Sequence, residues 1–194
     1  MEIGKLNNES GLTDCRKIVF AVSALAIVIL AIYSSTFHYP FHFDDRQNIE
    51  ERSALHLKEL SWPNIKKTFY NEKWNLYRPV ACLSLAINYY FGEKNVFGYH
   101  LMNVCIHFIS SCFLFLLIYR LINLPVFQNK YSADAYFIAL LSAILWATNP
   151  LQTQAVTYIV QRMASLAGMF YVISMYLYLK GRLSQEKYIK YLLL

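Results

Sequence analysis

Two adjacent carboxylates, Asp44 and Asp45, follow a long apolar run in the stretch FHFDDRQNI. A carboxylate can take the proton of a hydroxyl group as that hydroxyl attacks an electrophile. Neighbouring carboxylates also repel each other, which favours a shared proton or a bound divalent cation, and His38 and His42 could complete such a metal site. The pair therefore predicts a general base or a metal site. The alternative is structural, with Asp45 as the N-cap of a helix in QNIEER.

Two arginines are candidates for binding a phosphate group, because a guanidinium presents a planar fork of donors to phosphate oxygens. Arg162 lies beside Gln161 within an apolar run, where an unpaired charge is costly, so we expect it to face the protein interior or a polar cavity. The alternative to phosphate binding is that the Arg162 side chain extends to the membrane surface. Arg78 precedes Pro79, and its alternative role is an interfacial anchor that touches lipid phosphate.

A polar face is predicted on the helix over residues 99–121, because polar residues recur there at spacings of three and four. They are His100, Asn103, His107, Ser110 and Ser111. We expect His107 and the serines to form hydrogen bonds between helices. His100 is nearer the outer end and is the better candidate for contact with a substrate.

The composition indicates a membrane protein, since 57% of the 194 residues are hydrophobic and 16% are aromatic. The formal charge of +6 comes from Lys and Arg scattered between apolar blocks, so no nucleic-acid-binding stripe is predicted. The four cysteines show no zinc spacing and no disulfide framework.

The predicted fold class is all-α, a multi-pass transmembrane helical bundle. Four spans are expected, over residues 18–33, 99–121, 135–148 and 155–179, and residues 187–194 read as the start of a fifth. Short loops rich in Lys and Arg place the N-terminus and the segment after residue 182 in the cytoplasm, and the loop over residues 34–98 outside it. Two interfacial helices are expected in that loop, one after Ser61 and one from Pro79 to Gly92.

The motifs FDD, YRPV, SLAINYYFG, FGYHLMNVCIHF and NPLQTQAVTYIVQRMASLAGMFYVISMYLYLKGR occur in an order that resembles bacterial relatives of the TMTC proteins. These are multi-pass glycosyltransferases of the GT-C superfamily, usually followed by tetratricopeptide repeats. The resemblance implies transfer of a sugar from a polyprenyl-phosphate donor to a protein or glycan acceptor on the outer face. It also implies that an acid in the first outer loop, Asp44 or Asp45, is the catalytic base or a metal ligand.

The chain departs from the family pattern at the end of the third span. Relatives often carry His-Pro and Thr-Glu there, whereas this sequence has Asn149-Pro150 and Thr153-Gln154. Asn149 and Gln154 can bind a sugar by hydrogen bonds, but they cannot transfer a proton as the titratable residues could.

The predicted protein is the N-terminal part of a GT-C-like membrane domain, residues 1–194, without the tetratricopeptide repeats. Its membrane would be the bacterial cytoplasmic membrane, with the active site on the outer face. The alternative is a non-catalytic membrane module that assembles with a separate partner chain supplying further spans and repeats. A transporter is disfavoured, because the charged residues gather in the outer loop.

Overall fold

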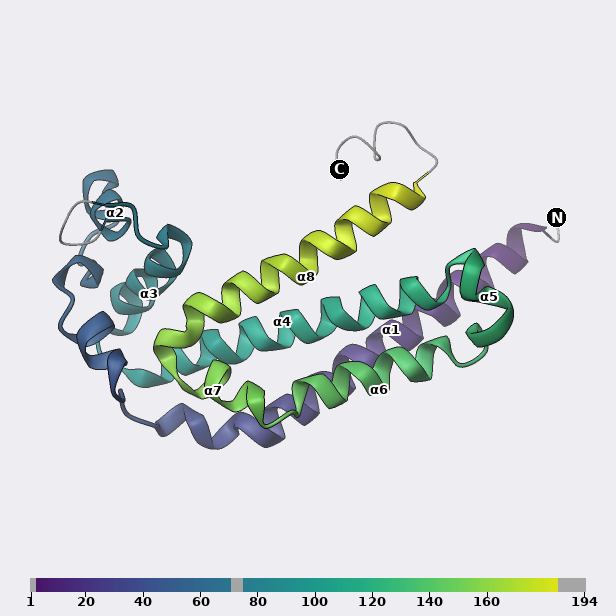
Figure 1. The fold of residues 1–194 in the computed structure, drawn as a ribbon, viewed down its shortest axis with the longest axis horizontal. Helices are drawn as coiled ribbons and strands as arrows, with labels where there is room; N and C mark the ends of the chain where they lie inside the picture. Colours follow the sequence, from purple (N-terminus) through teal and green to yellow (C-terminus); the bar gives the residue numbers. More distant parts are fainter. Residues whose placement is uncertain (1–2, 71–74, 185–194) are drawn as a thin grey trace. The chain divides into compact units, whose positions relative to one another are not determined.

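The computed structural model describes residues 3–70 and 75–184, and these residues form an all-α structure (Figure 1). The long helices are α1 (Ile3–Tyr33), α4 (Val96–Ile122) and α8 (Arg162–Leu183). The shorter α-helices are α2 (Trp62–Thr68), α3 (Pro79–Gly92), α5 (Pro125–Tyr131), α6 (Ala135–Ala147) and α7 (Leu151–Thr157). Within the described ranges no strand forms, although Tyr70 and Leu76 make one isolated antiparallel bridge. The predicted all-α class is confirmed.

Three helical segments are long and apolar enough to cross a membrane. They are Cys15–His38, Val96–Ile122 and Ile159–Leu183, and the bent pair α6 and α7 would add a fourth span if it forms one. The first two segments contain the first two predicted spans, α6 matches the third predicted span, and Ile159–Leu183 overlaps the fourth. The predicted fourth span was wrong at its start, because α7 ends at Thr157 and Tyr158 is extended, with φ −91° and ψ 112°. The predicted start of a fifth span, residues 187–194, lies outside the described residues.

The chain divides into two compact units, and α1, α4 and α8 each contribute to both. The first unit takes its residues from Met1–Ala31, Phe108–Thr148 and Tyr171–Leu194. The second consists of the described residues of Ile32–His107 and Asn149–Phe170. All the candidate site residues belong to the second unit.

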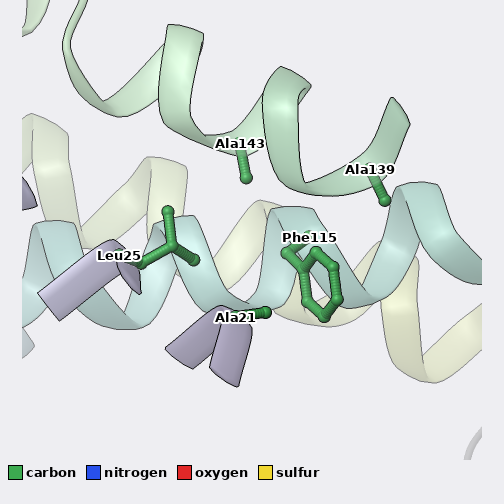
Figure 2. Packing of buried hydrophobic residues seen from close by; sticks show 5 residues of the cluster. All are labelled: Ala21, Leu25, Phe115, Ala139 and Ala143. Carbon is green, nitrogen blue, oxygen red and sulfur yellow. The ribbon is translucent and has the colours of Figure 1, made fainter. Parts of the chain in front are cut away.

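The core of the first unit is formed by α1, α4 and α6 (Figure 2). Ala21 and Leu25 of α1 and Phe115 of α4 are buried together with Ala139 and Ala143 of α6. Alanine recurs on α6 at every fourth position from residue 135 to residue 147, and all four alanines are buried. Small side chains at this spacing allow neighbouring helices to approach closely, as is usual in membrane bundles.

The second unit contains the helices predicted in the outer loop. Helix α3 begins at Pro79 and ends at Gly92, as the sequence predicted. Helix α2 follows Ser61, which occupies the N-cap position but makes no side-chain capping bond. The position of these two helices at a membrane surface stays a prediction. Among the described residues, the non-glycine residues with positive φ are Phe43, Arg78 and Glu93. Each such conformation costs roughly 1–3 kcal/mol, which contacts with the surrounding structure must offset.

Candidate functional site

The two neighbouring acids have different surroundings, and Asp45 is the buried one. Its side chain is 1% exposed. Oδ1 accepts the backbone N–H of Val160 at 2.6 Å, and Oδ2 accepts the backbone N–H of His42 at 3.2 Å. Asp45 therefore joins the loop after α1 to the segment that leads into α8.

The predicted N-cap role of Asp45 was wrong. Its backbone is already helical, with φ −58° and ψ −39°, and its side chain makes no capping bond to the following π-helix, Arg46–Glu50. An N-cap residue normally has an extended backbone, which turns its side chain toward the first free N–H groups of the helix. The carboxylate instead reaches backward to His42 and across to Val160.

Burial raises the pKa of the Asp45 carboxyl, because the charged form loses its hydration. The backbone N–H groups of Val160, His42 and Ile159 oppose this effect, and so does the electrostatic interaction with His100. Asp45 is thus an acid whose surroundings favour the protonated form more than water does.

Asp44 is exposed, and its carboxylate has no hydrogen-bond or ion-pair partner within the described part of the chain. Its backbone is fixed instead. The N–H of Asp44 donates to the Tyr158 hydroxyl at 3.0 Å, and its carbonyl accepts from Asn48 Nδ2 at 2.9 Å. Phe43, directly before it, has φ 43°. A fixed backbone therefore presents an unpaired carboxylate.

A pocket of about 470 Å³ lies beside this acid. Its walls come from the loop after α1 and from α7 with the residue that follows it, and they are formed by Tyr39, His42, Phe43, Gln154, Thr157 and Tyr158. The rings of Phe43 and Tyr158 meet edge to face, with centroids 6.5 Å apart. Aromatic faces with a few hydrogen-bonding groups and a volume in this range are typical of small-molecule sites.

Arg162 is fully buried, as the sequence predicted for a charge within an apolar run. Its guanidinium donates to four oxygens. Nε donates to Asn103 Oδ1 at 2.8 Å, and the terminal nitrogens donate to Asn88 Oδ1 at 2.6 Å, Tyr99 O at 2.8 Å and Ser84 Oγ at 3.5 Å. The predicted alternative of extension to the membrane surface was wrong. With 0% exposure and four protein acceptors, the guanidinium presents no surface to a donor phosphate, so its geometry is that of a positioning residue.

Asn103 connects this arginine to the pocket. Its Oδ1 accepts from Arg162, while its Nδ2 donates to the carbonyls of Val156 at 3.2 Å and Tyr158 at 3.3 Å. The carbonyl of Tyr158 accepts the backbone N–H of Gln161 at 3.1 Å, and Asn103 is a second donor to the same oxygen. Asn103 therefore helps to fix the residue whose hydroxyl accepts the backbone N–H of Asp44.

The other predicted binding residues are distributed around this network. Arg78 is exposed, and its guanidinium lies 5.3 Å from the centroid of the Tyr77 ring. Asn149 is exposed, and its Oδ1 accepts the N–H of Leu151. Gln154 lines the pocket, whereas Gln161 is half-buried in the short 3₁₀ segment Ile159–Gln161.

His100 is buried, and its two ring nitrogens differ. Nε2 donates to the carbonyl of Tyr39, a residue of the pocket wall, at 2.9 Å. Nδ1 is buried without a hydrogen-bond partner among the described residues. With Nε2 carrying the proton, Nδ1 is left as an acceptor that a hydroxyl group could satisfy.

The described residues contain no group of three or more His, Cys, Asp or Glu side chains that could hold a metal ion. Of the acid pair, Asp44 has the carboxylate that could bind a divalent cation, since both Asp45 oxygens accept backbone N–H groups. The predicted contribution of His38 and His42 to a metal site is not supported by this arrangement.

Sequence reasoning missed Tyr158 and Asn103 as residues that shape the site. The sequence predicts that Tyr99 and Tyr158 belong to an interfacial aromatic belt, but Tyr99 is 1% exposed and Tyr158 lines the pocket. Tyr158 directly follows the helix that begins after Asn149-Pro150. An aromatic residue at the end of that helix was the signal in the sequence that could have indicated a residue of the site.

The chain is similar to protein O-mannosyl-transferases of animals. It is 30% identical over 162 residues to protein O-mannosyl-transferase TMTC2 of Mus musculus, an alignment that covers 78% of this chain and 18% of that protein. It is also 30% identical over 171 residues to protein O-mannosyl-transferase TMTC3 of Mus musculus, which covers 83% of this chain and 17% of that protein. A Caenorhabditis elegans protein O-mannosyl-transferase, F38B6.6, is 27% identical over 166 residues.

No family model matches the chain, and no solved structure matches it. The chain spans about a fifth of the length of the curated relatives it matches. A bacterial origin stays a prediction. Over about four fifths of its own length, the chain is homologous to protein O-mannosyl-transferases of the TMTC family, in agreement with the resemblance carried by its motifs.

Proposed function

We propose that the chain is part of a membrane glycosyltransferase of the GT-C type, which uses a polyprenyl-phosphate sugar as donor. The names of the relatives support mannose as the sugar and a protein hydroxyl group as the acceptor. The apolar helices fit a protein that meets a lipid-linked donor within the membrane.

Asp44 is the proposed general base. It would take the proton of the acceptor hydroxyl as that oxygen attacks the anomeric carbon of the sugar. The new bond joins the acceptor oxygen to the anomeric carbon, and the bond from that carbon to the phosphate oxygen breaks. The polyprenyl phosphate leaves with the electron pair. The observation that carries this proposal is the unpaired, exposed carboxylate of Asp44 on a backbone held by Tyr158 beside the pocket.

The remaining polar residues suit binding rather than proton transfer. Gln154 is in the pocket wall and could bind sugar hydroxyls. The Nδ1 of His100 is buried and does not line the pocket, so its further hydrogen bond would come from a buried water molecule, and His100 would act on the site through the Tyr39 carbonyl. Arg78 is the proposed ligand of the donor phosphate, because the residue is exposed and its guanidinium donates to Met163 Sδ, at 2.9 Å, whereas that of Arg162 is buried with four oxygen acceptors. Asn149 and Gln161 remain candidates for further contacts.

The test is mannosyl transfer in membranes of cells that express the chain, with radiolabelled polyprenyl-phosphate mannose and a serine- and threonine-rich protein acceptor. Asp44→Asn preserves the shape of the side chain but removes the proton acceptor, so transfer should fall about 100-fold or more. Donor binding should persist. If wild type and Asp44→Asn transfer at the same rate, or neither transfers, the catalytic role of this chain is refuted and the non-catalytic module is favoured.

We also propose that the pocket lies outside the cytoplasm, because Lys and Arg flank the opposite ends of the spans. Alkaline phosphatase, which is active only outside the cytoplasm, should be active when fused at Glu59 and inactive when fused at Lys180. The reverse pattern would overturn the orientation without affecting the assignment of the base.

A further inference from the structure

A second pocket of the outer loop, of about 230 Å³, has a wall rich in hydrogen-bond donors. It lies between the 3₁₀ segment Ser53–Leu55 and helix α2. Its polar lining residues are Ser53, His56, Lys58, Asn64 and Lys67. These side chains are different from those that form the sugar pocket beside Asp44.

The charge of this second pocket is positive. Lys58 and Lys67 line it, and among the residues that the structure describes no Asp or Glu does. Both lysines are exposed, and the ion pairs within the described residues, Arg46–Glu51 and Lys94–Glu50, involve neither of them. Glu93 lines a neighbouring pocket that shares Leu57 and Lys58 with this one, but it makes no ion pair with Lys58. Two ammonium groups without a carboxylate between them favour an anionic ligand.

One wall of the second pocket is held in place by His56. Its Nε2 donates to the Glu50 carbonyl at 3.1 Å, and its ring stacks on Tyr89 with centroids 4.3 Å apart and planes 10° from parallel. Leu55 and Leu57 on either side of it are buried. These contacts hold the backbone from residue 53 to residue 58 in place, so the pocket wall is already ordered before an anion binds.

Two large apolar side chains project beside this positive pocket. Leu60 is 57% exposed and Trp62 is 70% exposed, and both lie within four residues of Lys58. Exposed Leu and Trp next to lysines are characteristic of segments that lie in the membrane interface, where rings sit at headgroup level and ammonium groups meet phosphate.

We propose that the second pocket binds the phosphate of an anionic phospholipid headgroup, with Lys58 and Lys67 as its cationic ligands and with Leu60 and Trp62 entering the lipid. Ser53 and Asn64 supply neutral donors to the same phosphate. This site would fix the outer loop, and with it α2, to the membrane surface. The inference does not depend on the proposed glycosyl transfer.

The test uses the full chain with Trp62 as its one tryptophan, after Trp74→Phe and Trp146→Phe, reconstituted into phosphatidylcholine vesicles. A small fraction of the lipid carries brominated acyl chains, which quench nearby tryptophan, and is either phosphatidylglycerol or phosphatidylcholine. Trp62 should be quenched more strongly by brominated phosphatidylglycerol. Each lysine near an anionic surface contributes about fivefold to binding, so Lys58→Gln with Lys67→Gln should reduce the preference by about tenfold or more.

Lys66→Gln is the matched control, because Lys66 is exposed on α2 but does not line the second pocket. As a single lysine near the surface it should cost no more than about fivefold, which is less than the loss in the double variant. An equal loss in Lys66→Gln would mean diffuse surface attraction and would overturn the site. Equal quenching by the two brominated lipids would also overturn it. If soluble glycerol phosphate binds in a lysine-dependent manner while the lipid preference is absent, the occupant is a soluble phosphate and the lipid assignment fails.

Discussion

Val160 donates its backbone N–H to Asp45 Oδ1 at 2.6 Å, across 115 residues of sequence. Two residues earlier, the Tyr158 hydroxyl accepts the N–H of Asp44 at 3.0 Å. The same short segment thus binds both acids, one through its carboxylate and the other through its backbone. The two neighbouring carboxylates therefore have different roles. Asp45 stabilises the loop through its hydrogen bonds, whereas the exposed Asp44 carboxylate is available as the proposed base.

The first prediction concerns the stability that Asp45 provides. Asp45→Asn keeps one oxygen but turns an NH₂ group toward a backbone N–H, so a buried donor loses its acceptor. We expect the free energy of unfolding to fall by about 1–3 kcal/mol. Thermal unfolding of the purified chain measures this loss. Asp44→Asn is the control and should change stability by no more than about 0.5 kcal/mol, because its carboxylate is exposed. Equal losses in the two variants would contradict the division of tasks.

The second prediction concerns pH and follows from the raised pKa of Asp45. The folded chain binds this proton at a higher pH than the unfolded chain, whose carboxyl has the ordinary pKa of 3.8. Protonation therefore favours folding, and the resulting stability is lost as the pH rises from 3.8 through the folded-state pKa. The stability difference between wild type and Asp45→Asn should shrink over this window. A difference that widens with rising pH would show that the folded-state pKa is lowered instead.

Local signals in the sequence predicted much of the fold. Pro79 and Gly92 marked the ends of α3, because proline suits the first turn of a helix and glycine suits its end. The polar face on α4 was confirmed as buried, since His100, Asn103 and His107 are each at most 4% exposed. Such signals act within one or two helical turns, where side-chain spacing alone decides which residues share a face.

The division of the acid pair could not be predicted, because it depends on contacts between distant residues. Asp44 and Asp45 have the same side chain and adjacent positions, and partners 114 and 115 residues away distinguish them. Similarly, the acceptors Asn103 and Asn88 lie 59 and 74 residues before Arg162. The burial of Arg162 was predictable from the apolar run around it. That Arg162 cannot bind a donor phosphate could be seen only from its four oxygen acceptors, which come from distant parts of the sequence.

The third prediction concerns Arg162. Arg162→Leu leaves two buried oxygens, those of Asn103 and Tyr99, and the half-buried Asn88 Oδ1 without the donor they have now, so we expect a loss of about 3–5 kcal/mol. Arg162→Lys keeps the charge but cannot reach all of these acceptors from one ammonium group, so it should recover only part of the loss. Thermal unfolding with a size-exclusion profile measures both variants.

Arg78→Leu is the control for Arg162, because Arg78 is exposed and its guanidinium contacts Met163 Sδ and the Tyr77 ring rather than four oxygens. It should cost about 1 kcal/mol of stability, much less than Arg162→Leu, while weakening donor binding. If Arg162→Leu folds with wild-type stability and loses donor binding, the positioning role is wrong and direct contact of Arg162 with phosphate is restored.

The fourth prediction concerns Tyr158, whose hydroxyl accepts the N–H of Asp44. Tyr158→Phe keeps the ring that lines the pocket and removes one hydrogen bond, worth about 1 kcal/mol. If that bond sets the position of the base, transfer should fall at least fivefold, with donor affinity unchanged, because the ring surface and Gln154 remain. Tyr99→Phe is the matched control, since its hydroxyl bonds the Glu93 carbonyl and does not line the pocket. It should transfer at close to the wild-type rate. Equal losses in the two variants would indicate a general effect of removing a tyrosine hydroxyl, whereas a selective loss in Tyr158→Phe ties the rate to the backbone of Asp44.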